Sequence, residues 1–317
     1  MMNKLSQLKH MTKVVADTGD IDQIKQYSPD DATTNPSLLL KAAEMPEYDY
    51  VFKQAVENSK HLAGDKKVEE IMYQLAVGFG LEILKIIPGR ISTEVDARLS
   101  FDTQGTIDSA HRIIGLYEKA GISRERVLIK VAATWEGVQA AKVLQSEGIF
   151  CNLTLIFHIA QAIACAEVGV TLISPFVGRI TDWFKKDEGA KDFPPVDEDK
   201  GVLSVCEIYN YFKHFGYNTT VMGASFRHVG QVEALAGCDA LTISPQLLSE
   251  LKNDDAELPQ KLSKENTQSV SKIDCSEANF RWLMNESPMA TEKLAEGIRN
   301  FGKDTVKLEN LIKQKIA

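Results

Sequence analysis

The amino-acid sequence predicts an α/β fold, a (β/α)8 TIM barrel with extra helices that include a C-terminal helical extension. Short apolar runs of strand type alternate with segments of helical periodicity, and there are eight such runs. Polar residues also collect near the ends of these runs, where a parallel barrel places its reactive groups. We expect one domain over 1–317, with the barrel at about 13–245 and the helical extension at about 246–317.

The eight predicted strands are short and mostly apolar, as is typical of strands buried in a parallel sheet. In chain order they are 13–17, 31–34, 90–96, 127–132, 150–155, 171–175, 220–224 and 240–243. Segments between most of them repeat apolar residues every three or four positions, which predicts helices. These helices are 67–87, 103–120, 135–147, 156–168 and 204–215.

Several residues punctuate these elements. Pro36 suits the first turn of a helix, and Thr134 suits an N-cap directly after the fourth strand. Gly148 and Gly169 each follow a helical pattern, as glycines at helix C-termini do. We further predict a short helix before Lys13, a helix at 247–253, an irregular segment at 254–268, and two or three amphipathic helices over 276–317. The charged, proline-bearing segment 185–200 is expected to be an exposed insertion.

Composition excludes several classes of function. Lys and Arg number 36 against 44 Asp and Glu, so the net charge of −8 argues against non-specific binding to nucleic acid or a membrane surface. No apolar run is long enough to span a membrane, and no secretory signal is expected. Five scattered cysteines without C-x-x-C spacing indicate reduced thiols in a cytoplasmic protein, and no metal site is expected.

Lys130 interrupts the fourth strand, Val127-Leu128-Ile129-Lys130-Val131-Ala132. An ammonium inside a buried strand is costly unless it is compensated, and burial favours the neutral amine. A neutral amine can attack a carbonyl and form a Schiff base. The alternative is a lysine at an exposed strand end with no chemical role.

Other polar residues stand near the predicted strand ends, and together they favour an active site over a set of unrelated structural residues. Most have a structural alternative: a turn or N-cap for Asp17, an ion pair with Arg90 or Arg98 for one of Glu94 and Asp96, pairing with backbone groups for Asn152 and Thr154, and a surface position for the arginines. The candidates are Asp17, Thr33, Asn35, Glu94, Asn152, Thr154, Ser174, Arg179, Ser225 and Arg227.

Seven segments resemble those of transaldolases, and the resemblance covers essentially the whole chain. It is closest to the long bacterial transaldolases of the pentose phosphate pathway. The segments are VADTGD at 15–20, DATTNPS at 31–37, RISTEVDAR at 90–98, VLIK at 127–130, NLTL at 152–155, ISPFVGR at 173–179 and MGASFR at 222–227.

The resemblance implies transfer of a dihydroxyacetone unit from sedoheptulose 7-phosphate or fructose 6-phosphate to glyceraldehyde 3-phosphate or erythrose 4-phosphate, with no cofactor. It implies Lys130 as the Schiff-base amine, Glu94 acting through a water held by Thr154, and Asp17 as the acid and base of bond cleavage. The substrate-binding residues that it implies are Asn35, Thr33, Asn152, Ser174, Phe176, Arg179, Ser225 and Arg227.

Two alternative functions remain open at this stage. One is the related fructose 6-phosphate aldolase, a smaller enzyme without such a tail, in which the position of Glu94 is typically not an acid. The other is a non-catalytic sugar-phosphate binder, which would have no need of Lys130 beside two carboxylates. Besides sugar-phosphate substrates, the expected partner is a second copy of the chain in a homodimer.

Overall fold

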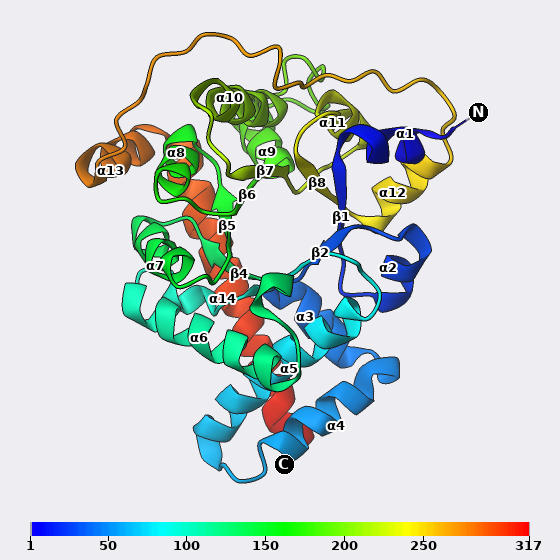
Figure 1. The fold of residues 1–317 in the computed structure, drawn as a ribbon, viewed down its shortest axis with the longest axis vertical. Coiled ribbons are helices and arrows are strands. Elements are labelled where there is room, and N and C mark those ends of the chain that lie inside the picture. Colours follow the sequence, from blue (N-terminus) through cyan, green and yellow to red (C-terminus); the bar gives the residue numbers. More distant parts are fainter. Residues whose placement is uncertain (1, 317) are drawn as a thin grey trace.

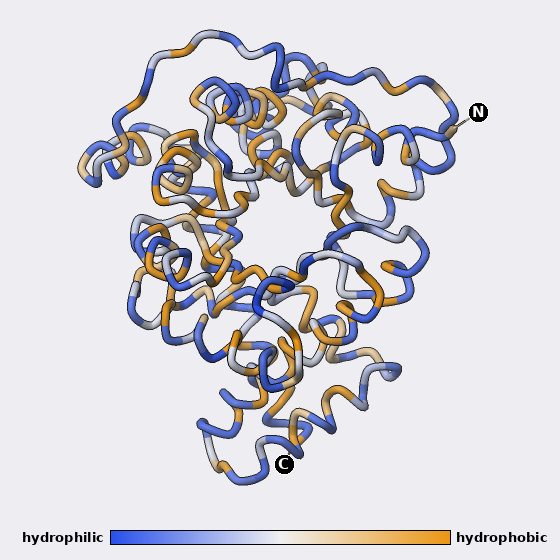
Figure 2. The backbone as a smooth tube through the Cα atoms, viewed as in Figure 1, coloured by the Kyte–Doolittle hydropathy of each residue, from blue (hydrophilic) through white to orange (hydrophobic). Residues whose placement is uncertain are grey.

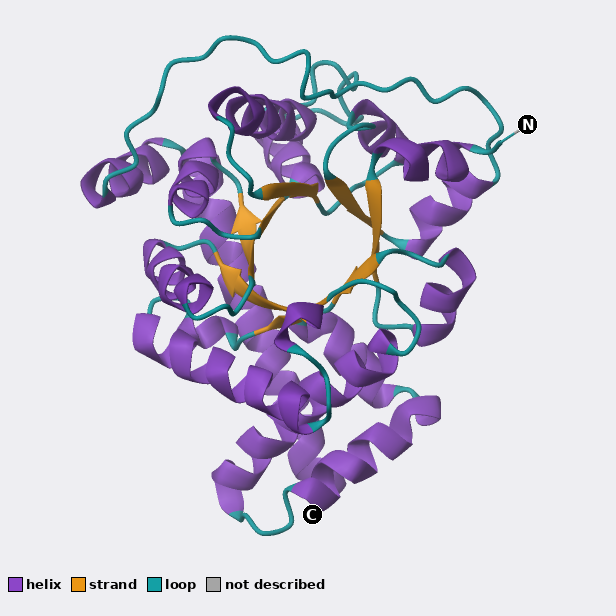
Figure 3. Cartoon of the chain, viewed as in Figure 1, coloured by secondary structure: helices purple, strands orange, loops and turns teal. Residues whose placement is uncertain are grey.

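Eight parallel strands form a closed barrel in the computed structural model, which describes residues 2–316 (Figures 1 and 3). Each strand pairs with its neighbours in chain order, and β1 closes the ring against β8. This confirms the predicted TIM barrel. The strands are β1 (Lys13–Asp17), β2 (Asp31–Thr33), β3 (Ile91–Glu94), β4 (Val127–Ala132), β5 (Cys151–Ile156), β6 (Leu172–Pro175), β7 (Thr220–Gly223) and β8 (Ala240–Ile243).

Helices surround the ring of strands, and Figure 2 shows hydrophobic and hydrophilic segments alternating along them, as expected of helices that cover a barrel. In chain order they are α1 (Lys4–Met11), α2 (Ile21–Tyr27), α3 (Pro36–Glu44), α4 (Asp49–Asn58), α5 (Gly64–Leu84), α6 (Thr103–Lys119), α7 (Trp135–Ser146), α8 (Ile159–Glu167), α9 (Val177–Asp187), α10 (Lys200–Phe215), α11 (Val229–Ala234), α12 (Pro245–Lys252), α13 (Glu277–Glu286) and α14 (Pro288–Ile316).

The predicted helix signals are confirmed at several ends. The Thr134 hydroxyl accepts a hydrogen bond from the Gly137 amide, and Pro36 occupies the first turn of α3. Gly148 and Gly169 both have φ of +74°, the left-handed conformation that glycine adopts without a steric penalty. Several predicted boundaries were wrong by a few residues. Helix α8 begins at Ile159, not at 156, because His158 and Gln161 form a capping box there.

Strand β3 is shorter than the predicted 90–96 and ends at Glu94. The Asp96 carboxylate instead accepts a hydrogen bond from the Arg98 amide and caps the 3₁₀ helix Ala97–Leu99. Asp96 also pairs with the Arg98 guanidinium at 2.6 Å, which is the structural ion pair considered from sequence. Helices α2, α4, α9 and α11 were not predicted.

The C-terminal part contains two helices, as predicted, after a segment 253–276 without regular structure. The long helix α14 contacts β5, α3, α5 and α9, and Figure 1 shows it passing behind the barrel wall. Segment 188–198 is mostly exposed, as expected of an insertion, but Asp199 beside it is fully buried. No helix within residues 2–316 is long and apolar enough to cross a membrane.

The inside of the barrel is divided into an apolar layer and a polar layer. Val15, Leu128, Leu172, Met222 and Ala240 form a separate buried cluster there. Because inward positions alternate along a strand, the next inward position lies two residues further on. On β1 and β4 those positions are Asp17 and Lys130, so the polar layer lies toward the carboxyl ends of the strands.

Candidate active site

The polar layer is assembled by strand register. Glu94 of β3 is directly beside Lys130 of β4, and Lys130 is beside Asn152 of β5. On the other side of the barrel, Asp17 of β1 is beside Thr33 of β2. Neighbouring strands lie about 4.8 Å apart, so adjacent inward side chains are within contact distance. The fold therefore brings together residues that are far apart in the sequence.

Lys130 is buried and lies within ion-pair distance of one carboxylate. Its Nζ lies 3.1 Å from Oε2 of Glu94, and the two side chains are 7% and 3% exposed. The same Nζ donates a hydrogen bond of 3.2 Å to the backbone carbonyl of Thr34. Oε2 makes no hydrogen bond within residues 2–316. The lysine is therefore held in place while its carboxylate neighbour keeps an unused acceptor.

Both carboxyl groups are held in the protonated form more strongly than in water. Burial raises the pKa of Glu94, and the nearby Lys130 ammonium only partly opposes this effect. Burial likewise raises the pKa of Asp17, opposed by Lys130, by the Thr33 hydroxyl and by Arg179. Carboxyl groups of raised pKa next to a buried amine are suited to accept and return protons.

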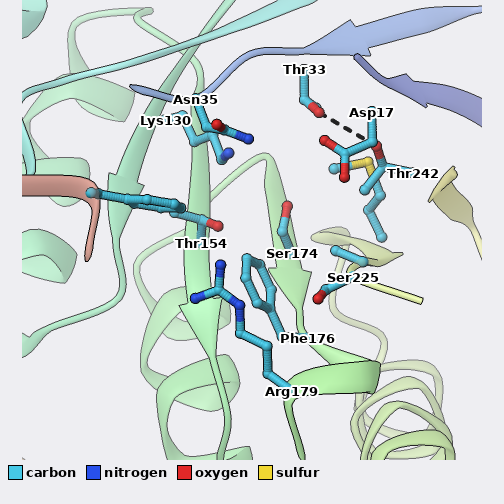
Figure 4. A pocket seen from close by; sticks show the side chains of 13 residues that line it. Asp17, Thr33, Asn35, Lys130, Thr154, Ser174, Phe176, Arg179, Ser225 and Thr242 are labelled. Atoms are coloured by element: carbon cyan, nitrogen blue, oxygen red, sulfur yellow. Dashed lines mark hydrogen bonds between the residues drawn. The ribbon is translucent and has the colours of Figure 1, made fainter. Parts of the chain in front are cut away.

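A second buried polar atom near the lysine is unpaired. Thr154 Oγ1, like Glu94 Oε2, has no hydrogen-bond partner among the described residues. Thr154 lines the cavity at Lys130 (Figure 4). Buried polar atoms are rarely left unpaired, so these two atoms mark a place suited to a polar ligand group or water.

The cavity has a volume of about 80 Å³ and lies at the carboxyl ends of the strands (Figure 4). The structure brings nine predicted residues together around it: Asp17, Thr33, Asn35, Lys130, Thr154, Ser174, Phe176, Arg179 and Ser225. Four further residues line it that sequence reasoning missed: Met222, Ala224, Thr242 and Phe301. Thr242 hydrogen-bonds to Thr33 across 3.4 Å, and alternation along its strand could have revealed it as an inward residue.

Three predicted residues do not line this cavity. Glu94 is in contact with Lys130, as described above. Asn152 is fully buried, donates to Ser92 Oγ at 3.1 Å and accepts from Ser174 Oγ at 2.7 Å. It thereby fixes the Ser174 hydroxyl. Arg227 lies at the rim, with Nη1 3.3 Å from Ser225 Oγ.

Asn35 has two roles that one amide can serve together. Its Oδ1 accepts a hydrogen bond of 3.0 Å from the Leu38 amide and caps α3. The side-chain nitrogen takes no part in this cap, and the residue lines the cavity. The Asp17 side chain caps no helix, since Asp20 is the N-cap of α2. The turn or capping role considered for Asp17 is therefore filled by a different residue.

Two non-glycine residues of the site have left-handed backbone conformations. Leu155 has φ of +56° and Ser225 has φ of +63°. At Leu155, β5 has one more residue than β6 between paired positions, which is a β-bulge directly after Thr154. Such conformations cost about 1–3 kcal/mol each and concentrate at functional sites. Here they border Thr154 and the two arginines.

The two arginines differ in their surroundings. Arg179 is partly buried, which lowers its pKa, and the neighbouring Arg227 lowers it further. Its guanidinium carbon lies 4.9 Å from the ring centre of Phe176. Arg227 instead pairs with a carboxylate: Nε and Nη2 donate to Oδ2 of Asp182 at 3.0 and 2.7 Å. Two adjacent cations form a site for an anionic group such as a phosphate.

The described residues were also compared with the pattern of side chains that holds a metal ion. Within residues 2–316, no group of three or more His, Cys, Asp or Glu side chains is arranged to hold a metal ion. The five cysteines are all free. The cavity offers an amine, one carboxyl group, hydroxyls and one guanidinium group, and the Glu94 carboxyl and the Arg227 guanidinium lie next to it.

Comparison with known proteins agrees with this geometry. Residues 14–312 match the family model described as Transaldolase/Fructose-6-phosphate aldolase. The chain is 57% identical over 319 residues to a transaldolase of Shewanella sp. (strain W3-18-1), with both chains covered completely. It is 58% identical over 318 residues to a transaldolase of Shewanella woodyi, covering 100% of this chain and 99% of that one, and 57% identical over 317 residues to one of Cellvibrio japonicus, covering 99% of each. The matches span nearly the whole chain, and the chain therefore belongs to the transaldolase/fructose-6-phosphate aldolase family.

Proposed function

We propose that this chain, a transaldolase like its full-length relatives, transfers a dihydroxyacetone unit between sugar phosphates through a Schiff base on Lys130. The observation that carries the proposal is a buried lysine amine that shares one cavity with Asp17 and lies 3.1 Å from Glu94. A protein that only bound sugar phosphates would gain nothing from an amine between two carboxyl groups.

Imine formation requires several proton transfers. The Lys130 amine attacks the ketose carbonyl carbon, a C–N bond forms, and the carbonyl oxygen takes a proton. The resulting hydroxyl then leaves as water after a second protonation. We assign these transfers to Glu94, acting through a water at Thr154. The raised pKa of Glu94 and the unpaired atoms Glu94 Oε2 and Thr154 Oγ1 support this assignment.

Cleavage then breaks the carbon–carbon bond next to the iminium. We assign to Asp17 the removal of the proton from the sugar hydroxyl, so that the hydroxyl carbon becomes an aldehyde. The electron pair of the broken bond moves to the iminium and gives an enamine. An acceptor aldehyde next receives this pair, and Asp17 returns the proton. Its raised pKa and its place in the cavity support the role.

The remaining residues are proposed to hold the substrate. Asn35, Thr33, Ser174 and, through Ser174, Asn152 are suited to the hydroxyls of the dihydroxyacetone unit, and Phe176 to the cavity wall. We assign the phosphate to Arg179, Arg227 and Ser225. Two guanidinium groups and one hydroxyl lie close together at the rim of the cavity, which supports this assignment. The local positive charge contrasts with the net charge of −8 of the whole chain.

The proposal extends to the oligomeric state, the cellular location and the domain organisation of the chain. We propose a homodimer and a cytoplasmic location, both from the resemblance to long bacterial transaldolases; the five free cysteines agree with a reducing compartment. We also propose that 246–317 belongs to the same domain as the barrel. Contacts of α14 with β5 and α9 support this.

Acceptor dependence tests the transferase assignment against the aldolase alternative. The full-length protein is given fructose 6-phosphate alone, and release of glyceraldehyde 3-phosphate is followed with a coupled assay. The same measurement is repeated with erythrose 4-phosphate. We expect rapid turnover only with the acceptor and formation of sedoheptulose 7-phosphate. Rapid turnover without the acceptor would identify an aldolase and overturn the transferase assignment.

A further inference from the structure

Arg179, unlike the neighbouring Arg227, has no carboxylate partner among the described residues. Within residues 2–316, no carboxylate lies within ion-pair distance of it, and none of its N–H groups makes a hydrogen bond to protein. It is nevertheless partly buried, and burial lowers its pKa. A partly buried guanidinium that makes no hydrogen bond to protein must be oriented by other contacts of the protein.

Two aromatic rings supply that orientation. The guanidinium carbon lies 4.9 Å from the ring centre of Phe176 and 5.6 Å from that of Phe301. Cations over aromatic faces are stabilised by about 0.5–2 kcal/mol. Neither contact is a hydrogen bond, so the N–H donors of the guanidinium stay available to a ligand. Figure 4 shows the Arg179 side chain rising beside Phe176 toward Thr154.

Phe301 comes from α14, which is remote in the sequence from Phe176, the residue between β6 and α9. It is only 4% exposed and lines the same cavity as Lys130. One turn earlier, Gly297 allows this close approach: a Cβ there would lie 3.3 Å from Nη1 of Arg179 and 2.7 Å from Cδ2 of Leu155. A side chain at Gly297 would therefore require the side chains of Leu155 and Arg179 to shift.

Helix α14 is also tied to the site by polar contacts. Asp304 accepts a hydrogen bond from Ser37, two residues after Asn35. Further along, Glu309 pairs with Arg98 at 2.7 Å. These contacts fix the position of Phe301 relative to the ends of β2 and β3. The ring is held by the protein frame and does not depend on a bound substrate.

We propose that Phe301 is a positioning residue that orients Arg179 for the substrate phosphate, so that the C-terminal helix forms part of the anion subsite. The inference rests on the proposed function and adds α14 to it. Phe301 contacts the guanidinium of Arg179. Its loss therefore weakens recognition of phosphorylated substrates and leaves the amine chemistry at Lys130 intact.

Phe301→Met tests this, because methionine retains bulk without an aromatic face. Phe301→Tyr retains the ring, and Phe280→Met is the matched control, since Phe280 is also 4% exposed but packs against Trp135 outside the cavity. Steady-state transfer from fructose 6-phosphate is measured with erythrose 4-phosphate and with unphosphorylated D-glyceraldehyde as acceptors. Competitive inhibition by inorganic phosphate gives a direct measure of anion binding.

We expect Phe301→Met to raise KM for erythrose 4-phosphate and Ki for inorganic phosphate about 10-fold, which corresponds to about 1.4 kcal/mol. KM for D-glyceraldehyde and kcat should change less than about 2-fold, the change expected of a residue that acts only on the phosphate. Phe301→Tyr and Phe280→Met should retain the preference for the phosphorylated acceptor. In an Arg179→Lys background, Phe301→Met should have no further effect on Ki, because the planar group it orients is gone.

Equal losses with both acceptors, or an unchanged Ki for phosphate, would overturn the inference. The inference would also be overturned if Phe301→Met raised Ki for phosphate as much in the Arg179→Lys background as in the wild-type protein. Borohydride trapping separates this failure from failure of the proposed function. An adduct on Lys130 with normal phosphate recognition in Phe301→Met refutes only the role of Phe301, whereas absence of an adduct in the unmodified protein refutes the Schiff-base mechanism.

Discussion

The Lys130–Glu94 pair has a consequence for stability that depends on pH. At 3.1 Å and an effective dielectric constant of about 20, two unit charges attract by about 5 kcal/mol. Desolvation opposes this attraction, as the raised pKa of Glu94 indicates. Breaking a buried pair by removing one partner typically costs about 3–5 kcal/mol. We take the lower end, because Lys130 also borders the cavity.

Lys130→Met should therefore lower stability by about 3 kcal/mol at about pH 8. For a chain of this length that is a fall in Tm of roughly 6 °C. Without the lysine, burial alone acts on Glu94 and raises its pKa further. A carboxyl whose pKa is raised in the folded state loses stability as pH rises, so the penalty should be smaller at about pH 5. Lys130→Met/Glu94→Gln removes both charges and should recover the wild-type Tm.

Thermal unfolding followed by circular dichroism at the two pH values measures these differences. Lys53→Met is the control, since Lys53 forms an exposed pair with Asp49 at 2.8 Å, and its loss should cost less than about 1 kcal/mol. The reasoning would be refuted if the Lys130→Met variant were as stable as the wild-type protein at about pH 8. It would equally fail if the double variant were no more stable than Lys130→Met.

Three further variants separate the proposed roles. Asp17→Asn should lower kcat about 10³-fold, while Lys130 still forms an adduct. The substitution should also raise Tm, and more so at about pH 8 than at about pH 5, because it removes a buried carboxylate of raised pKa. An unchanged kcat would exclude Asp17 as the base. Thr154→Val should slow adduct formation roughly 10- to 100-fold in a stopped-flow trapping assay. Tm should not fall, because the substitution removes a buried hydroxyl that has no hydrogen-bond partner. A rate of adduct formation equal to wild type would count against the water at Thr154. Asp182→Asn should raise KM for erythrose 4-phosphate about 5-fold at constant kcat, because Arg227 loses the carboxylate that orients it. An equal rise in KM for D-glyceraldehyde would show a general structural effect.

The sequence was sufficient to predict the barrel and most of the polar layer. Strands buried on both sides have an apolar signature, so Lys130 and Asp17 stood out against it. Alternation by two then placed Asn152 and Thr154 on one face, which the structure confirms. How deep each lies could not be predicted, because depth depends on the stagger between strands. Asn152 is fully buried, whereas Thr154 reaches the cavity.

Other features of the site depend on tertiary packing alone. Nothing in the sequence near Phe301 distinguishes it from other apolar residues of an amphipathic helix. Its place beside Arg179 follows from how α14 packs on the barrel. The pairing of Arg227 with Asp182 joins α9 to the loop after β7 and has no local signature. The left-handed conformations of Leu155 and Ser225 likewise occur in residues that rarely adopt them.

Borohydride trapping of the intact protein tests the central claim most directly. The protein is incubated with fructose 6-phosphate and sodium borohydride, digested, and examined by peptide mass spectrometry. The account predicts a reduced dihydroxyacetone adduct on the peptide that contains Lys130, and no adduct in Lys130→Ala. An enzyme that turns over fructose 6-phosphate and erythrose 4-phosphate without any adduct at Lys130, or with an adduct on another lysine, would contradict it.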